Sequence, residues 1–280
     1  MNGQLTQDMI QQPRQWRLAL EVCGRSLGCA LWPEGADDSA IAAEIGFPAD
    51  ANGQLRGLEE AVYANPLLLE DFAAVTVAVD SREFTIVPSP LAESCTPAAI
   101  LEAAGLESEG REVVVDFSPA GFAIVYAVDS ALFAFLRRTF FNVEIIHRLT
   151  PLINARLAAV ADAAPGSQAV AGIAGDGRID IIATTGSALA AANTFAYTDT
   201  ADAAYCLLAV DTVATGGAAS LAVGGSDAGA VAAFIGRYAA APDILPPSPL
   251  APRFGDTAPA LTAALAAYLE TRTSSNGDNQ

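Results

Sequence analysis

Residues 176 and 177 form an Asp-Gly pair between two runs of β-forming residues, and this pair constrains the fold more than any other feature of the chain. Asp-Gly is typical of a two-residue hairpin turn, because both central positions of the favoured turn adopt positive φ angles. A capping pair, Thr198-Asp199, then precedes apolar residues at helical spacing. Residues 167–210 are therefore predicted to form a βββα unit. Its elements are Gln168–Ala174, Arg178–Thr184, Ala188–Tyr197 and a helix over Ala201–Val213.

A similar plan occurs in the first half of the chain, so we expect two related lobes. An opening hairpin is predicted over Trp16–Cys23 and Leu27–Trp32, and residues 33–53 form a connection with room for one short helix. The further elements expected in this half are a helix over Leu55–Tyr63, a hairpin of Phe72–Val79 with Glu83–Val87, a helix over Ser89–Ala104, strands over Val113–Phe117 and Phe122–Val128, a helix over Ser130–Arg138, a strand over Val143–His147 and a helix over Pro151–Ala161. The second half continues with a strand at Ser220–Val223, a helix at Ala228–Tyr238, an irregular stretch at Pro242–Pro252 and a helix at Pro259–Thr271.

The length of 280 residues and the 52% hydrophobic content suit an α/β protein with mixed sheets and two domains. Pro165-Gly166 is the favoured boundary between the lobes, and Thr150-Pro151 is the alternative. The resulting division is a flexible leader (1–15), a first lobe (16–164), a second lobe (165–270) and a disordered tail (271–280).

The charged residues exclude several classes of enzyme. All 14 basic residues are arginine, and with 32 acidic residues the net charge is -18. Without lysine the chain cannot form a P-loop, the active site of a protein kinase or a pyridoxal Schiff base. Nucleic acid is not expected as a partner, because phosphate binding needs clustered basic residues. Compositional bias explains the acidity more simply than an acidic docking surface does.

Neither a secretory signal nor a membrane-spanning segment is recognisable, so a cytoplasmic protein without membrane insertion is expected. His147 is the only histidine, which excludes a His-rich metal centre. The four cysteines lack C-x-x-C spacing and are expected to be thiols rather than zinc ligands or disulfides.

Several segments together resemble an uncharacterised bacterial family described as having an actin-like ATPase fold. The most specific is Asn193-Thr194-Phe195-Ala196-Tyr197 followed by Asp202 and Tyr205. The opening hairpin, Phe84–Pro88, Phe122–Arg138 and Val143–Arg148 add to the resemblance. Element by element, the resemblance covers about 90% of the chain. The chain is more distantly similar to pilus-assembly members of the actin-like superfamily, whose two ribonuclease-H-like lobes hold ATP in the cleft between them. The resemblance therefore implies two such lobes.

The nucleotide-binding positions implied by this resemblance are only partly present. In such proteins the first hairpin of each lobe normally carries an Asp followed two residues later by a Gly, because a carboxylate orients Mg²⁺ while backbone N–H groups bind phosphate. The first lobe has no aspartate over Leu20–Ser26, and in the second lobe the hairpin closes at Asp176, which suits the turn. Val223-Gly224-Gly225-Ser226 does match the Gly-Gly that packs against adenosine, although a sharp turn would also explain it.

Glu21 is an acid inside an apolar strand. The resemblance implies that it projects towards the cleft as a remnant of the metal-orienting carboxylate, and a polar strand position facing solvent is the alternative. The candidate residues of a remnant nucleotide cleft are thus Glu21, Gly24, Gly224 and Gly225. No catalytic residue and no metal ligand is predicted.

One further motif is Gly24-Arg25-Ser26-Leu27-Gly28, which fits the G-x-S-x-G pattern of a hydrolase nucleophile elbow, with Asp116 or Asp129 and His147 as partners. The elbow requires a strand, a turn and then a helix, whereas a β-like run follows this turn.

Three functions remain as hypotheses. The favoured one is a non-catalytic actin-like protein, or pseudo-ATPase, that acts as an interaction or assembly module for an unknown protein partner and needs no cofactor. The alternative is a protein that binds or weakly hydrolyses ATP with Mg²⁺. An unrelated hydrolase is the third hypothesis.

Overall fold

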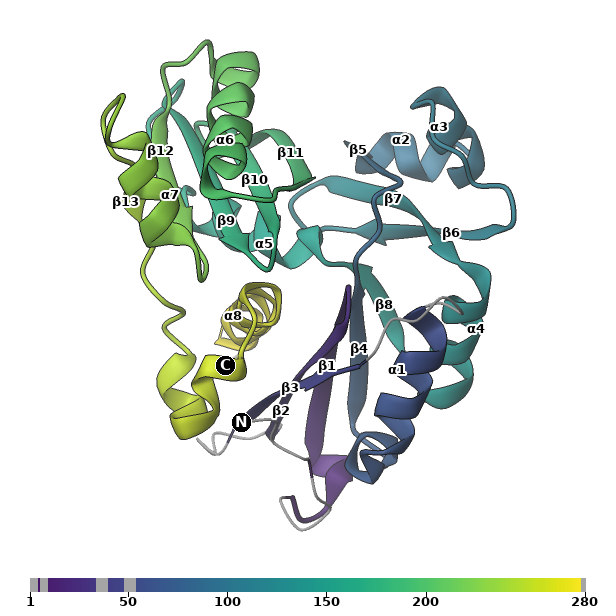
Figure 1. Cartoon of the computed structure of the whole chain (residues 1–280). Helices are drawn as coiled ribbons and strands as arrows, with labels where there is room; N and C mark the ends of the chain where they lie inside the picture. Colours follow the sequence, from purple (N-terminus) through teal and green to yellow (C-terminus); the bar gives the residue numbers. More distant parts are fainter. Residues whose placement is uncertain (1–4, 6–9, 34–39, 48–53, 278–280) are drawn as a thin grey trace. The chain divides into compact units, whose positions relative to one another are not determined.

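The computed structural model describes Leu5 and residues 10–33, 40–47 and 54–277 of the chain (Figure 1). Its strands are β1 (Trp16–Cys23), β2 (Ser26–Pro33), β3 (Ile41–Gly46), β4 (Ala74–Val79), β5 (Phe84–Pro88), β6 (Arg111–Phe117), β7 (Phe122–Asp129), β8 (Glu144–His147), β9 (Gln168–Gly175), β10 (Arg178–Thr185), β11 (Ala188–Ala196), β12 (Ser220–Gly224) and β13 (Asp243–Ile244). Its helices are α1 (Gln54–Tyr63), α2 (Ser89–Ser94), α3 (Pro97–Ala103), α4 (Ser130–Thr139), α5 (Leu149–Ala159), α6 (Thr200–Thr215), α7 (Ala228–Ile235) and α8 (Ala263–Gly277), with 3-10 helices η2 (Pro13–Gln15), η3 (Pro66–Leu69) and η4 (Ala251–Ala260).

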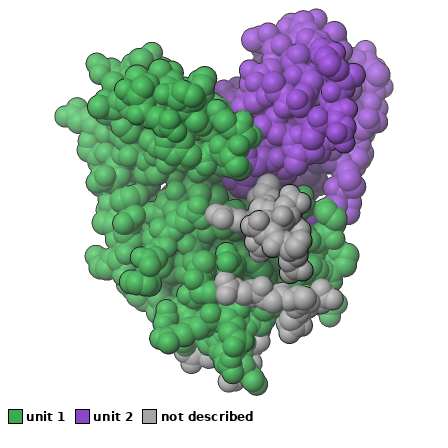
Figure 2. Space-filling view, turned by 180° about the vertical axis from the view of Figure 1, so that it is seen from behind, with its two compact units in different colours: residues 1–150, 249–273 green, residues 151–248, 274–280 purple. Residues whose placement is uncertain are grey.

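The chain forms two compact units (Figure 2). Unit 1 contains residues 1–150 and 249–273, and unit 2 contains residues 151–248 and 274–280. The division after Thr150 differs from the favoured boundary at Pro165-Gly166 and coincides with the alternative. Residues 249–273 return to unit 1 because their apolar side chains, such as Phe254 and Leu265, join its core.

Each unit contains a five-stranded mixed sheet with the same plan. In unit 1 the order is β3-β2-β1-β4-β8, and in unit 2 it is β11-β10-β9-β12-β13. In both sheets the first three strands in sequence pair antiparallel, and the remaining two add in parallel to the other side of the first strand. The prediction of two related lobes of mixed α/β structure is therefore confirmed.

The Asp-Gly hairpin forms where the sequence predicts it. Gly175 pairs with Arg178, so only Asp176 and Gly177 form the turn, with φ angles of 53° and 71°. Helix α6 then begins after Asp199, whose side chain accepts hydrogen bonds from the N–H groups of residues 201 and 202 at 2.8 and 3.0 Å. These backbone groups would otherwise lack partners at the start of the helix.

The connection predicted over residues 33–53 contains a strand, so that prediction is wrong for its central part. Strand β3 pairs with β2, and its outer edge is covered by η4 through the Ala42 N–H, which donates to the Thr257 hydroxyl at 3.0 Å. Alanine-rich sequence has little intrinsic strand preference, so pairing with β2 determines this strand. Residues 34–39 and 48–53 lie outside the described residues.

Two further predictions are wrong in unit 1. Phe72–Val79 and Glu83–Val87 do not form a hairpin: β4 pairs with β1 and β8, whereas β5 pairs with β7 in a separate sheet of order β5-β7-β6. The helix expected over Ser89–Ala104 is divided into α2 and α3 because Pro97 disfavours a helical conformation at the residue before it.

Some residues near the two ends of the chain are described. In the leader, residues 1–4 and 6–9 lie outside the described residues, but Leu5 and Ile10 are buried. Helix α8 continues to Gly277, beyond the expected end at Thr271, and residues 278–280 lie outside the described residues. Among the described helices, none has the length and apolar character needed to cross a membrane.

Helix α8 packs closely on one face of the central sheet of unit 1, and α1 and α4 lie on the other side (Figure 1). Small residues on the α8 face allow this approach. A Cβ atom added to Gly28 of β2 would lie 3.1 Å from Thr262 Cγ2 and 3.3 Å from Leu265 Cδ1. The core between this sheet face, η4 and α8 consists mainly of Ala19, Ala30, Trp32, Ala42, Ala78, Ile146, Phe254, Leu265, Tyr268 and Leu269.

We expect Gly28→Val to displace α8, because the new side chain needs space that Thr262 and Leu265 occupy. Urea unfolding should show a loss of about 1–3 kcal/mol in the free energy of unfolding. Gly46→Val on β3 is the matched control, since a Cβ atom there meets nothing within 4 Å. Equal effects of the two substitutions would contradict close packing of α8 at Gly28.

Candidate functional site

Glu21 of β1 forms a buried ion pair in unit 1. In the sheet it lies between Gly28 of β2 and Ala78 of β4, on the face that α8 covers. Arg148, which follows β8, donates its Nε–H to Glu21 Oε1 at 2.9 Å. The Glu21 and Arg148 side chains are only 2% and 3% exposed. The solvent-facing position considered for Glu21 is therefore wrong, because this carboxylate is buried beside an arginine.

The second oxygen of this carboxylate is also engaged. Thr262, the residue before α8, donates its hydroxyl hydrogen to Glu21 Oε2. The same hydroxyl oxygen accepts the N–H of Leu265 at 3.3 Å, in the first turn of the helix. The Glu21–Arg148–Thr262 cluster thus joins β1, the end of β8 and the start of α8.

Both hairpin turns are short. Cys23 pairs directly with Ser26, so Gly24 and Arg25 are the whole β1–β2 turn, with Gly24 at a φ of 53°. The corresponding β9–β10 turn in unit 2 is equally short. A two-residue turn contributes the N–H groups of only two residues to an anion site, fewer than a longer glycine-rich loop or a helix start contributes.

In unit 2, Gly224 ends β12 and Gly225 follows it before α7, and packing accounts for both glycines. Gly225 has a φ of 91°, and a Cβ atom added to it would overlap the Ala174 carbonyl oxygen and lie 2.9 Å from its carbon. A Cβ atom on Gly224 would lie 3.1 Å from Ile173 Cδ1. The chain that follows β12 therefore lies too close to the Ala174 backbone of β9 for any side chain at residue 225.

A polar contact next to these glycines was not anticipated from the sequence. The Tyr197 hydroxyl donates to Asp227 Oδ2, and the Asp227 N–H donates to the Ala174 carbonyl at 3.1 Å. Burial, followed by the hydrogen bond to Asp227, raises the pKa of Tyr197 well above its usual range. Tyr197 ends the most specific segment of the resemblance, but its partner is 30 residues away and has no local signal.

The hydrolase hypothesis finds no support in the geometry. His147 Nε2 lies 3.0 Å from the Ser81 carbonyl oxygen, and the Leu149 N–H donates to Nδ1 at 3.2 Å. Asp116 accepts the backbone N–H of His147 at 2.9 Å. The Ser26 hydroxyl donates to a backbone carbonyl of its own turn. Both imidazole nitrogens are engaged by backbone groups, so the ring has a structural role at the end of β8.

The carboxylate of Glu21 is already engaged within unit 1. Mg²⁺ binds carboxylate oxygens, and each oxygen of Glu21 already accepts a hydrogen bond, one from Arg148 and the other from Thr262. Among the described residues, no group of three or more His, Cys, Asp or Glu side chains is arranged to hold a metal ion.

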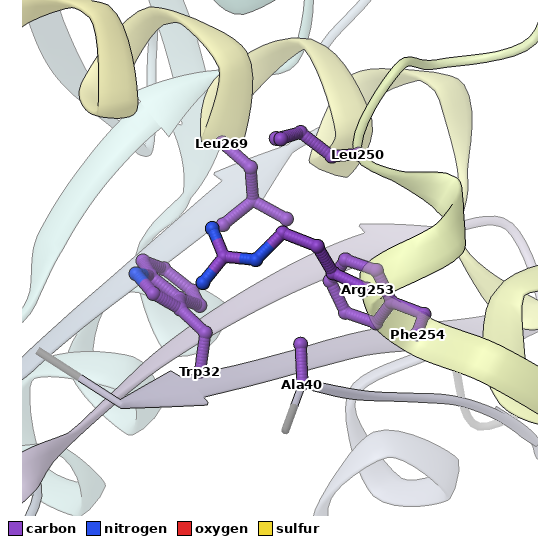
Figure 3. Close-up of a pocket in the computed structure, with 6 residues that line it drawn as sticks. All are labelled: Trp32, Ala40, Leu250, Arg253, Phe254 and Leu269. Atoms are coloured by element: carbon purple, nitrogen blue, oxygen red, sulfur yellow. The ribbon is translucent and has the colours of Figure 1, made fainter. Parts of the chain in front are cut away.

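The pocket in Figure 3 lies elsewhere in unit 1, and its lining is apolar except for Arg253, whose guanidinium lies between Trp32 and Leu269.

Comparison with solved structures establishes the fold. A protein from Bacteroides thetaiotaomicron VPI-5482, described as having an actin-like ATPase fold and unknown function, has a TM-score of 0.74 and 17% identity, over 92% of this chain and 97% of that chain. A chain of the PilM–PilN type IV pilus biogenesis complex has a TM-score of 0.57 and 15% identity, over 92% of this chain and 99% of that chain. The predicted actin-like fold is confirmed.

No curated protein gives a significant sequence match. A family model described as a protein of unknown function, DUF3822, matches residues 10–212, which is more than half of the chain. The chain therefore belongs to the DUF3822 family.

Proposed function

We propose that this protein is a non-catalytic actin-like protein that serves as an interaction or assembly module for another protein. The observation that carries the proposal is the state of Glu21, whose two carboxylate oxygens are used within the chain by Arg148 and Thr262. A catalytic actin-like site would need that position to orient Mg²⁺ and water at the phosphates. Here the carboxylate instead contributes to the packing of unit 1.

The charge and turns of unit 1 support the same conclusion. Mg²⁺ and nearby N–H groups normally balance the several negative charges of a bound triphosphate. Glu21 already has a positive partner, so a divalent cation would gain little there. The turn at Gly24 and Arg25 has only two residues, so it offers few backbone N–H groups to a phosphate.

ATP binding is the alternative, and Gly224-Gly225 is the feature that favours it. Close contact of Gly225 with the Ala174 backbone supplies a packing reason for this pair, so the match does not require adenosine. A protein partner is supported by the PilM–PilN complex, in which a chain of similar fold occurs together with another protein. Nucleic acid is disfavoured by the net charge of -18.

Isothermal titration calorimetry with Mg-ATP tests this proposal on the full chain. We expect no heat of binding, and no phosphate release in a parallel assay, because unit 1 supplies neither an available carboxylate nor a phosphate loop. Stoichiometric binding with phosphate release would contradict the proposal and support the alternative. Binding of Mg-ATP without phosphate release would contradict the part of the proposal that says the protein works without a nucleotide.

The packing explanation of the Gly-Gly pair has a separate test. Gly225→Ala should lower the free energy of unfolding by more than about 2 kcal/mol, because the residue is at positive φ and its Cβ would overlap Ala174. Gly229→Ala in α7 is the matched control, and it should raise stability by up to about 1 kcal/mol because its Cβ meets nothing. If urea unfolding finds Gly225→Ala as stable as the wild type, packing does not explain this glycine.

A further inference from the structure

We infer that Arg148 is a built-in counter-cation for Glu21, which closes this position to divalent metal ions and holds helix α8 on unit 1 without one. The inference rests on the proposed function and deepens it, because it states how the site of unit 1 is kept independent of metal and nucleotide. Three groups of observations support it: the burial of the pair, the use of both carboxylate oxygens, and the connection to α8.

Burial makes a counter-cation necessary. An ionised carboxylate that is 2% exposed loses nearly all of its hydration, and it stays charged only beside a positive group or several donors. Arg148 supplies that positive group at 2.9 Å and is itself 3% exposed. A guanidinium group stays protonated at any physiological pH, so its charge is as permanent as that of a bound metal ion.

These contacts and the burial of Glu21 together act against a second, hydrated cation. Mg²⁺ binds carboxylate oxygens at about 2.0–2.1 Å with nearly octahedral geometry and retains several waters. At Glu21 the guanidinium of Arg148 covers Oε1 and the hydroxyl of Thr262 covers Oε2. A divalent ion would need to displace one of these donors and would also be repelled by the guanidinium. Arg148 therefore excludes the metal both by occupying the position and by its charge.

Thr262 connects the carboxylate to the C-terminal helix. Its hydroxyl donates to Glu21 and accepts the Leu265 N–H, so the position of the carboxylate determines where the first turn of α8 lies. Gly28, directly beside Glu21 in the sheet, allows Thr262 and Leu265 to approach at this point. The charge of Arg148 thereby contributes to the docking of a helix that lies more than 100 residues further along the chain.

The test removes the internal cation and asks whether an external one replaces it. In Arg148→Ala, the carboxylate loses its partner and space becomes available for a hydrated ion. MnCl₂ and MgCl₂, without nucleotide, are the probes on the full chain, with melting temperature and Mn²⁺ electron paramagnetic resonance as readouts. We expect one Mn²⁺ bound per Arg148→Ala chain and a rise in melting temperature of about 5 °C at saturation. The wild type should show neither effect.

Two variants serve as matched controls. Arg148→Met also removes the charge but fills the space, so it should show no Mn²⁺ response. Glu21→Gln combined with Arg148→Ala leaves the space but removes the acid, so it should show none either. If Arg148→Ala does not fold without metal, recovery of the folded chain on refolding in Mn²⁺, absent in the double variant, is the expected result.

Several results would overturn the inference. These are a Glu21-dependent Mn²⁺ site in the wild type, no Mn²⁺ effect on the melting or refolding of Arg148→Ala, or an equal effect in the double variant. The proposed function fails separately: Mg-ATP binding by the wild type that persists in Glu21→Gln contradicts the non-nucleotide role but leaves the counter-cation role of Arg148 intact.

Discussion

Burial of one carboxylate determines much of how unit 1 is assembled. Glu21 cannot be buried alone, so the chain brings it a cation from 127 residues away and a hydroxyl from 241 residues away. The three segments that meet there are the first strand of the sheet, the end of its last strand and the start of α8. The small residues around Glu21, Gly28 above all, allow α8 to approach this carboxylate.

The two lobes retain the strand plan that they share within an actin-like fold. Strand order and strand direction are the same in both sheets, so the scaffold of each lobe persists. In the function proposed here, the positions that the resemblance implies for phosphate and metal have structural roles: short turns close the hairpins, Arg148 neutralises Glu21, and Gly225 allows the chain after β12 to lie close to Ala174. A shared fold therefore does not by itself establish a shared activity.

Local chemistry explains what the sequence predicted well. The Asp176-Gly177 turn and the Asp199 cap depend on neighbouring residues, and both formed as expected. Strand β3 was missed because its alanines carry a weak strand signal and its partners lie outside the segment. The hairpin expected from β4 and β5 was wrong because short spacing cannot reveal that the two strands join different sheets. In the same way Glu21 stood out as an acid in an apolar strand, but no local pattern connects it to Arg148 or Thr262.

A double-mutant cycle on Glu21 and Arg148 tests the central claim most directly, with urea unfolding of the wild type, Glu21→Gln, Arg148→Met and the double variant. Breaking a buried pair on one side costs about 3–5 kcal/mol, because the remaining group is left without its partner. The account predicts that the double variant is more stable than the sum of the single effects implies, by about 2 kcal/mol or more. Additive effects within error would contradict it, since they would mean that the two side chains do not depend on each other.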